Sequence, residues 1–232
     1  MSTYLELCSL AREKCGIAGT GPADVTTQTG ELARLVGYVR DAYVDIQNLH
    51  PDWLWMRSST SFTTTASTGT YTTGSGAGTV NVAAASLGSW YRDTFRCYLT
   101  ATGTNDEQFL EYIPYDAWRN TFNFGAMRSA TGRPTVFSIS PARGICLGQI
   151  PAAGYTVTGD YQAAPTVLAA DGDTPGLPAQ YHMLIVWKAA MYYGVHEAAP
   201  EVYDEGLINY KRILSQLEID QRPDVHFAGA LA

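Results

Sequence analysis

The stretch AQYHMLIVWKAAMYYGVHE, residues 179–197, decides how the rest of the chain is interpreted. Its apolar residues fall on every side of a helix rather than along one stripe, as the run Leu184, Ile185, Val186 and Trp187 illustrates. A helix without a polar face is either central in its own bundle or buried by a neighbouring subunit. The sequence therefore predicts a helix here that must be covered on all sides.

Three further segments at the two chain ends have helical patterns. Thr3 to Cys15 has a possible cap in Ser2 or Thr3 and is followed by Gly16. Glu31 to Leu49 carries apolar residues at spacings of three and four and ends before Pro51. The helix that starts at Pro200 has one stripe, made by Tyr203, Leu207, Tyr210, Leu214 and Leu217. These patterns predict a four-helix bundle formed by residues 1–52 and 177–219.

The middle of the chain, residues 53–176, has the pattern of a β-domain. Short strand-like runs alternate with clusters of Gly, Pro, Asn and Ser, which is typical of a small antiparallel sandwich or barrel. The expected runs are 57–65, 79–82, 94–99, 109–113, 135–139, 145–150 and 155–162, with a helical turn at 114–119. The predicted fold class is therefore α+β: a bundle from both chain ends, an inserted β-sandwich or barrel-like domain, and an extended C-terminal arm at 220–232.

The charge composition argues against general nucleic-acid binding. The net charge is −7, and the fifteen Lys and Arg residues are spread along the chain without a run. General nucleic-acid binding needs clustered cations, so it is not expected. An acidic surface can instead line a passage for DNA, because it repels phosphates and keeps DNA from adhering.

The four cysteines form no CxxC motif and no metal-ligand spacing. No secretory signal is visible and no apolar run reaches the ~18 residues of a membrane span, so reduced thiols in a cytosolic setting and no membrane contact are expected. Asp171 and Asp173 imitate the start of a calcium loop, but position twelve of that loop would be His182 rather than an acid. We expect no metal ion and no cofactor.

Catalytic signatures are also missing from the sequence. There is no GxSxG motif, and none of the four histidines has a recognisable catalytic partner. Glu107, Glu111 and Asp116 lie near Tyr115 and Trp118, a combination that could serve glycoside hydrolysis or carbohydrate binding. An exposed strand edge with a solvated turn explains the same residues more simply. No catalytic residue is therefore predicted.

Two long segments resemble the head-to-tail adaptor, or neck, proteins of tailed bacteriophages. One is TYLELCSLAREKCGIAGTGP (3–22) followed by TGELARLVGYVRDAYVDIQNLHPDWLWMR (29–57), and the other is LAADGDTPGLPAQYHMLIVWKAAMYYG (168–194). The resemblance implies a structural virion protein, made in the cytoplasm of the bacterial host, that sits in the phage neck. The partners that the resemblance implies are further copies of the chain in a ring of twelve, the portal protein, a tail or nozzle protein, and genomic DNA that passes through without sequence-specific binding.

Carried onto this chain, the resemblance makes the C-terminal arm a portal-docking element, with Arg222, Pro223, Val225, His226 and Phe227 as its candidate contacts. The surplus of aromatic and apolar residues on the central helix suggests Trp187, Tyr192 and Tyr193 as candidate ring contacts. The alternatives are a tail-associated carbohydrate- or receptor-binding module that uses Trp118, and a cell-wall hydrolase that uses Glu107, Glu111 and Asp116.

Overall fold

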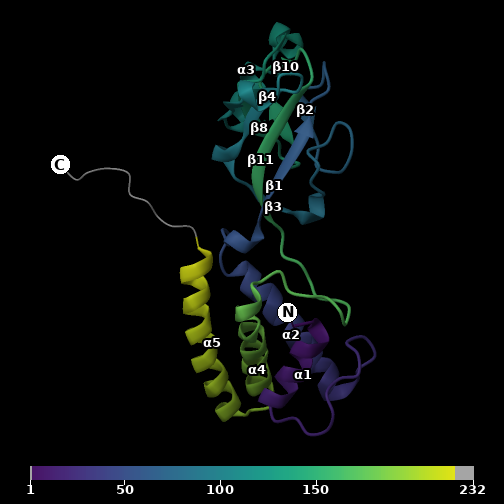
Figure 1. Cartoon of the computed structure of the whole chain (residues 1–232), viewed down its shortest axis with the longest axis vertical. Coiled ribbons are helices and arrows are strands. Elements are labelled where there is room, and N and C mark those ends of the chain that lie inside the picture. The colour runs from purple at the N-terminus through teal and green to yellow at the C-terminus, as the bar shows by residue number, and fades with distance from the viewer. Residues whose placement is uncertain (1, 223–232) are drawn as a thin grey trace, which may run out of the picture. The chain divides into compact units, whose positions relative to one another are not determined.

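The computed structural model describes residues 2–222 as an α+β protein with five α-helices and several short sheets (Figure 1). The chain divides into two compact units. The helical unit combines the chain up to Met56 with the chain from Pro165 onward, and the β-unit consists of Arg57–Ala164. Each unit has a hydrophobic core of its own.

Four α-helices build the helical unit, and they correspond to the four helices expected from the sequence. They are α1 (Tyr4–Lys14), α2 (Gly30–Asn48), α4 (Met183–His196) and α5 (Pro200–Gln221). Thr3 caps α1 through a capping box: its hydroxyl accepts from the Glu6 amide at 3.3 Å, and the Glu6 carboxylate accepts from the Thr3 amide at 3.0 Å. Helix α5 is longer than predicted, because the segment at Asp220 and Gln221 is still helical rather than the start of an arm.

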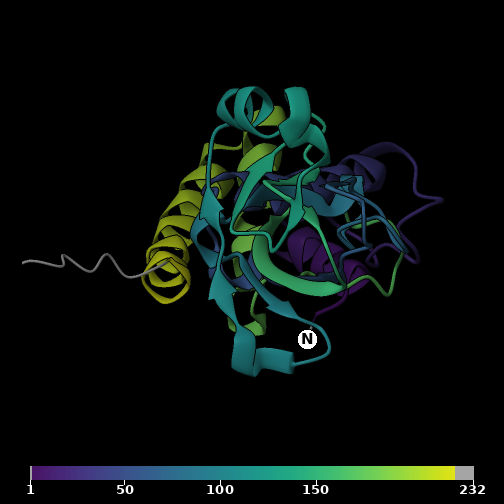
Figure 2. The same cartoon turned by 90° about the horizontal axis from the view of Figure 1, so that it is seen from above.

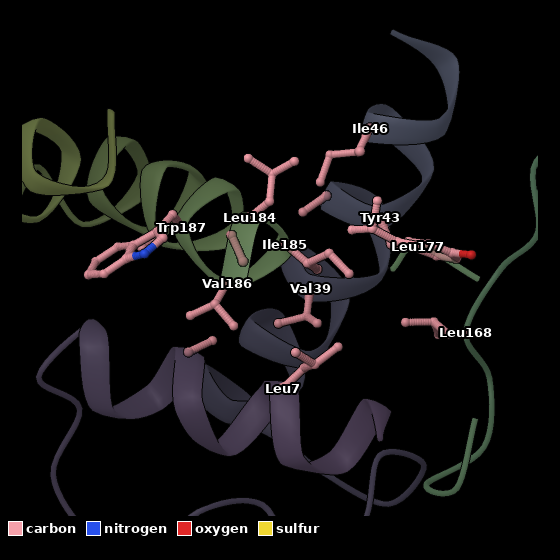
Figure 3. Close-up of a cluster of buried hydrophobic side chains, with 14 of the residues drawn as sticks. Leu7, Val39, Tyr43, Ile46, Leu168, Leu177, Leu184, Ile185, Val186 and Trp187 are labelled. Atoms are coloured by element: carbon pink, nitrogen blue, oxygen red, sulfur yellow. The ribbon is translucent and has the colours of Figure 1, made fainter. Parts of the chain in front are cut away.

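Helix α4 lies in the middle of the helical unit and packs against α1, α2 and α5. Leu184, Ile185 and Val186 are fully buried on different sides of it, and Figure 3 shows them among side chains from α1, α2 and the segment before α4. The all-round apolar character of α4 is therefore accounted for inside one chain. Trp53 and Leu168, which fall within the segment 53–176 of the expected insertion, are part of this same helical core.

Two glycines allow α4 and α5 to approach closely. A Cβ atom added to Gly194 would lie 2.8 Å from the Tyr203 amide nitrogen, and one added to Gly206 would lie 3.2 Å from the Trp187 carbonyl oxygen. Larger side chains would push the helices apart, since backbone atoms cannot yield as a flexible side chain can. The glycines thus fix which side of α5 faces the core and which side faces outward.

The β-unit contains eleven short strands within Arg57–Ala164, and one short helix, α3 (Tyr115–Thr121). Its strands are β1 (Arg57–Thr63), β2 (Thr70–Tyr71), β3 (Leu87–Trp90), β4 (Arg96–Leu99), β5 (Gln108–Phe109), β6 (Glu111–Tyr112), β7 (Thr131–Gly132), β8 (Val136–Ile139), β9 (Ile145–Leu147), β10 (Ile150–Pro151) and β11 (Tyr155–Ala163).

These strands form separate open sheets, so the barrel-like alternative is wrong. One sheet has the order β1-β11-β4-β5 with β3 also on β11, the second has the order β2-β9-β8-β6, and β10 pairs with β7. The nine-residue strand β11, green in Figures 1 and 2, is the longest and holds the first sheet together. The pairing is not purely antiparallel either, since β6–β8 and β7–β10 run parallel.

The first two sheets contribute to one core in the β-unit. Phe62, Cys97 and Val157 come from the first sheet, and Tyr71 and Phe137 come from the second. The expected strand at 79–82 is present only as isolated bridges, whereas β2 and β3 were not expected. The longer strands of the core, β1 and β11, were therefore visible in the sequence, whereas the two-residue β2 is too short to show an alternation.

Candidate assembly surface

The candidate ring residue Trp187 is a core residue of the helical unit. Only 7% of its surface is exposed, and Figure 3 places its indole at the edge of the buried cluster on α4. The ammonium group of Lys14 on α1 lies 5.3 Å from the ring centroid and covers it further. Its indole therefore has little surface left for a contact with another molecule.

Tyr192 and Tyr193, the other candidate ring residues, connect α4 to α2. The Tyr193 hydroxyl donates a 2.6 Å hydrogen bond to the Glu31 carboxylate, and the Tyr192 hydroxyl donates to Asp45. The hydrogen bond to Glu31 and burial raise the pKa of Tyr193, and burial followed by the bond to Asp45 raises that of Tyr192. Both rings are half-buried, so they hold the two helices together and still contribute to the outer surface.

A hollow of about 510 Å³ opens beside these tyrosines, between α2 and α4. Tyr38 approaches Tyr192 with ring centroids 6.1 Å apart and His196 at 6.3 Å, which gives the hollow aromatic walls. Val195 is 69% exposed, which is unusual for a β-branched apolar side chain next to aromatic rings. A second hollow of about 380 Å³ adjoins it on the α5 side of Val195. We call the combined area the Val195 surface; its residues are Tyr38, Asp41, Tyr192, Val195, His196, Ala198, Pro200 and Tyr203.

The outer side of α5 carries a different surface. Gly206, Tyr210, Ile213 and Leu217 face the core, whereas Ile208 lies on the opposite side and is 68% exposed. Lys211 and Arg212 are exposed about one turn further along the helix, and neither forms an ion pair in the part of the chain that the structure describes. We call Ile208, Lys211 and Arg212 the Ile208 face.

Only one candidate residue of the docking arm lies in the described part of the chain. Arg222 follows the last helical residue of α5 and is exposed. Pro223, Val225, His226 and Phe227 lie outside the described residues. Asp220, where the arm was expected to begin, accepts a hydrogen bond from the Tyr181 hydroxyl at 3.2 Å and is part of α5.

The β-unit does not present the aromatic floor that a carbohydrate site would need at Trp118. This side chain is only 7% exposed, its ring nitrogen donates to the Leu147 carbonyl oxygen at 2.8 Å, and Tyr115 stacks on it. Trp118 therefore anchors α3 onto the second sheet. Of the three acids suggested for hydrolysis, Glu107 faces Arg96 at 3.4 Å, and Asp116 and Glu111 are exposed.

The four cysteine thiols are buried in the two hydrophobic cores and their surroundings. Cys8, Cys15, Cys97 and Cys146 are all free and buried, and burial raises the pKa of Cys8 to about 12 and that of Cys97 to about 11. Thiols with so little thiolate are poor nucleophiles and poor metal ligands. Within residues 2–222, no group of three or more His, Cys, Asp or Glu side chains could hold a metal ion, and no helix is long and apolar enough to cross a membrane.

Asp171 and Asp173, whose spacing resembles the start of a calcium-binding loop, instead stabilise backbone turns. Asp173 accepts from the amides of Ala169 and Ala170 at 2.7 and 2.8 Å, and these bonds lower its pKa. Asp171 accepts from the Val25 amide at 2.7 Å, which ties the segment before α4 to the loop before α2. Their oxygens are thus directed at backbone N–H groups, as expected for Asp in turns.

Two comparisons with known proteins complete the description of the chain. No curated protein matches it. The family model described as SU10 adaptor protein matches residues 2–229, nearly the whole sequence. This match confirms the resemblance to phage adaptors seen in the two long terminal segments. The chain therefore belongs to the SU10 adaptor protein family, a family of phage structural adaptors, and is a virion component.

Proposed function

We propose that this protein is a non-enzymatic head-to-tail adaptor that forms a homo-oligomeric ring, a dodecamer, between the portal and the tail or nozzle. The observation that carries this proposal is the family match over residues 2–229. The ring surrounds the passage through which the genomic DNA leaves the capsid. Contacts with the portal come from the C-terminal segment that starts at Arg222.

The surface of the helical unit supports assembly. The Val195 surface and the Ile208 face leave branched apolar side chains in water although the same unit has a complete core. Exposed apolar patches next to aromatic residues are typical of protein–protein interfaces. Ring formation would bury such patches between copies.

The charge of the chain supports a passage for DNA. Residues 1–56 and 165–222 hold fifteen acidic and eight basic side chains, a net charge of −7. An acidic wall repels phosphates at close range, so DNA can move past it without binding. Because exposed charges are screened by salt, this effect is strongest near the wall and weak beyond about 8–10 Å at physiological ionic strength.

The direct test is to purify the full chain and image it by electron microscopy, alone and mixed with purified portal. The expected result is a closed ring, with twelve copies seated on the portal. A variant that lacks residues 223–232 should keep the fold and lose portal binding. Normal portal binding by this variant would remove the C-terminal segment from the proposal, and a chain that stays monomeric both alone and with portal would contradict the ring.

A further inference from the structure

We propose that the ring contact is heterologous: the Val195 surface of one copy binds the Ile208 face of the next copy. In this contact Ile208 enters the hollow between α2 and α4, and Arg212 reaches Asp41 at the rim of that hollow. The inference rests on the proposed ring and names the surfaces that close it.

Apolar complementarity is the first argument. The hollow of about 510 Å³ has two aromatic walls, from Tyr38 and Tyr192, and exposes Val195 at 69%. Ile208 is 68% exposed and lies on the side of α5 that faces away from α4. A branched aliphatic side chain against aromatic rings removes apolar surface of both partners from water, and this burial drives most associations.

Charge complementarity is the second argument. Lys211 and Arg212 have no carboxylate partner within residues 2–222, although the helical unit has a large excess of acids. Among the described residues, Asp41, which lines the hollow, forms an ion pair only with the adjacent Arg40 at 3.1 Å, and both side chains are about half exposed. Such a surface pair contributes little and leaves the carboxylate available. Ile208 and Arg212 are four residues apart and lie on one side of the helix, so one approach can satisfy both contacts.

The position of the two surfaces on one unit is the third argument. The Val195 surface is made by α2, α4 and the beginning of α5, and the Ile208 face lies on the outer side of α5. Because the two surfaces are different, their pairing repeats from copy to copy, and such heterologous contacts close into rings when the rotation permits. A self-complementary patch would instead give a symmetric dimer. The glycines at 194 and 206 keep α5 close to α4 and hold the Ile208 face outward.

The test is a charge-swap cycle measured by mass photometry and analytical ultracentrifugation, on the protein alone and with purified portal. Asp41→Arg and Arg212→Asp should each weaken self-association at least tenfold, and the double variant should restore it to within about threefold of the wild type. Glu13→Arg, an equal charge change on α1 at a side chain that is 60% exposed, should have no effect. Circular dichroism melting of each variant controls for loss of the fold.

A cysteine pair tests proximity without relying on charge. The four natural thiols are buried, so Val195→Cys and Ile208→Cys introduce the reactive ones. Mixing the two single variants under mild oxidation should give a disulfide-linked dimer, and the variant carrying both should give a ladder of linked copies. Rings that form with wild-type affinity in both charge variants, with no cross-link, would overturn this contact and leave the adaptor function intact. A wild type that never self-associates, with or without portal, would overturn the ring and this contact together.

Discussion

The helical unit and the β-unit differ most clearly in how they use charge. The helical unit has a net charge of −7 over residues 1–56 and 165–222, and it contains all three lysines of the sequence. The β-unit, residues 57–164, has six acids and seven arginines, a net charge of +1, with no lysine and no histidine. One unit leaves a large charge unbalanced, and the other is nearly neutral.

Four of the seven arginines of the β-unit contact aromatic side chains of the same unit. Arg57, Arg92, Arg96 and Arg133 each lie over an aromatic ring, at 4.4 to 6.0 Å from its centroid. Arg133 also donates to both carboxylate oxygens of Asp106 at 2.7 Å. A planar guanidinium can stack flat on a ring while its edge makes two parallel hydrogen bonds to one carboxylate, a geometry that an ammonium lacks. The comparison indicates that arginines of the β-unit stabilise its fold, whereas the helical unit carries an excess of acidic charge that its own cations do not balance.

The largest expected effect comes from a core substitution that unfolds the helical unit and leaves the β-unit folded. Leu35 is fully buried in the helical core, so Leu35→Asp places an unpaired carboxylate there and should cost about 5 kcal/mol or more. Hydrogen exchange measured by mass spectrometry should show lost protection in α2 and α4 and retained protection in residues 57–164. Arg34→Ala, at the exposed neighbouring position, is the matched control and should change stability by less than about 1 kcal/mol. Loss of protection in both units would mean that the two cores unfold as one.

The matching change in the β-unit is Phe137→Ala. Phe137 is fully buried, and its ring lies 4.4 Å from that of Phe95 and 5.6 Å from that of Tyr112. Removing it should cost about 3–5 kcal/mol, through lost burial and the cavity left behind. The same exchange experiment should now show lost protection in residues 57–164 and an unchanged helical unit. Phe109→Ala, at a ring that is 66% exposed, should be far milder, and an equal effect of the two changes would contradict the assignment of the core.

The helical unit could be predicted from sequence far better than the β-unit. The spacing of apolar residues in 31–49 identified α2, because a helix repeats its pattern over several turns, and the long all-round apolar run in 179–197 identified α4 as a central helix. The buried side of α5 was displaced from the predicted stripe: Gly206 and Ile213 are buried, whereas Leu207 and Leu214 are half-buried. Gly206 has no apolar side chain, so a pattern of apolar residues could not detect the close approach to α4 that it permits.

Strands of two or three residues, such as β2 and β9, carry too few positions for an alternation to appear. The parallel pairing of β6 with β8 depends on contacts between segments far apart in sequence, which local patterns do not contain. The β-unit could therefore be predicted as a class but not as a topology.

The candidate surface was only partly predictable for a related reason. The surplus of apolar and aromatic residues predicts Trp187 as a ring contact, but because α4 is central in the helical unit, this side chain packs in the core. A surplus of aromatic residues does not point to Val195 or Ile208; the detectable signal for Ile208 is its position opposite the buried side of α5. Tyr192 remains a predicted ring contact, and its hydrogen bond to Asp45 on α2 depends on how the two helices pack, which the sequence pattern does not contain.

The smallest expected effect is a difference in acid sensitivity between the units. His182 is buried in the helical unit; its Nδ1 accepts from the Ser2 amide at 3.2 Å and its Nε2 donates to the Leu177 carbonyl oxygen at 3.0 Å. Burial lowers the pKa of His182 in the folded chain. At a pH near the ordinary histidine pKa, the unfolded chain therefore binds more protons at this residue than the folded chain does. Stability of the helical unit should therefore fall as the pH drops below about 6.5, the ordinary value for histidine.

The β-unit should respond in a lower pH window, because it has no histidine. Hydrogen bonds from Arg133 lower the pKa of Asp106, so its contribution is present above about pH 4 and is lost only as the pH falls through the lowered value. Hydrogen exchange of both units between pH 7.5 and 5 should thus show a decline for the helical unit alone. His182→Gln should flatten that decline. His50, which contacts Glu218 at 2.7 Å, is present in both the wild type and the variant, so any effect of its protonation is the same in both and drops out when the two are compared. A parallel decline in the two units, or an unchanged slope in the variant, would show that His182 is not the origin of the difference.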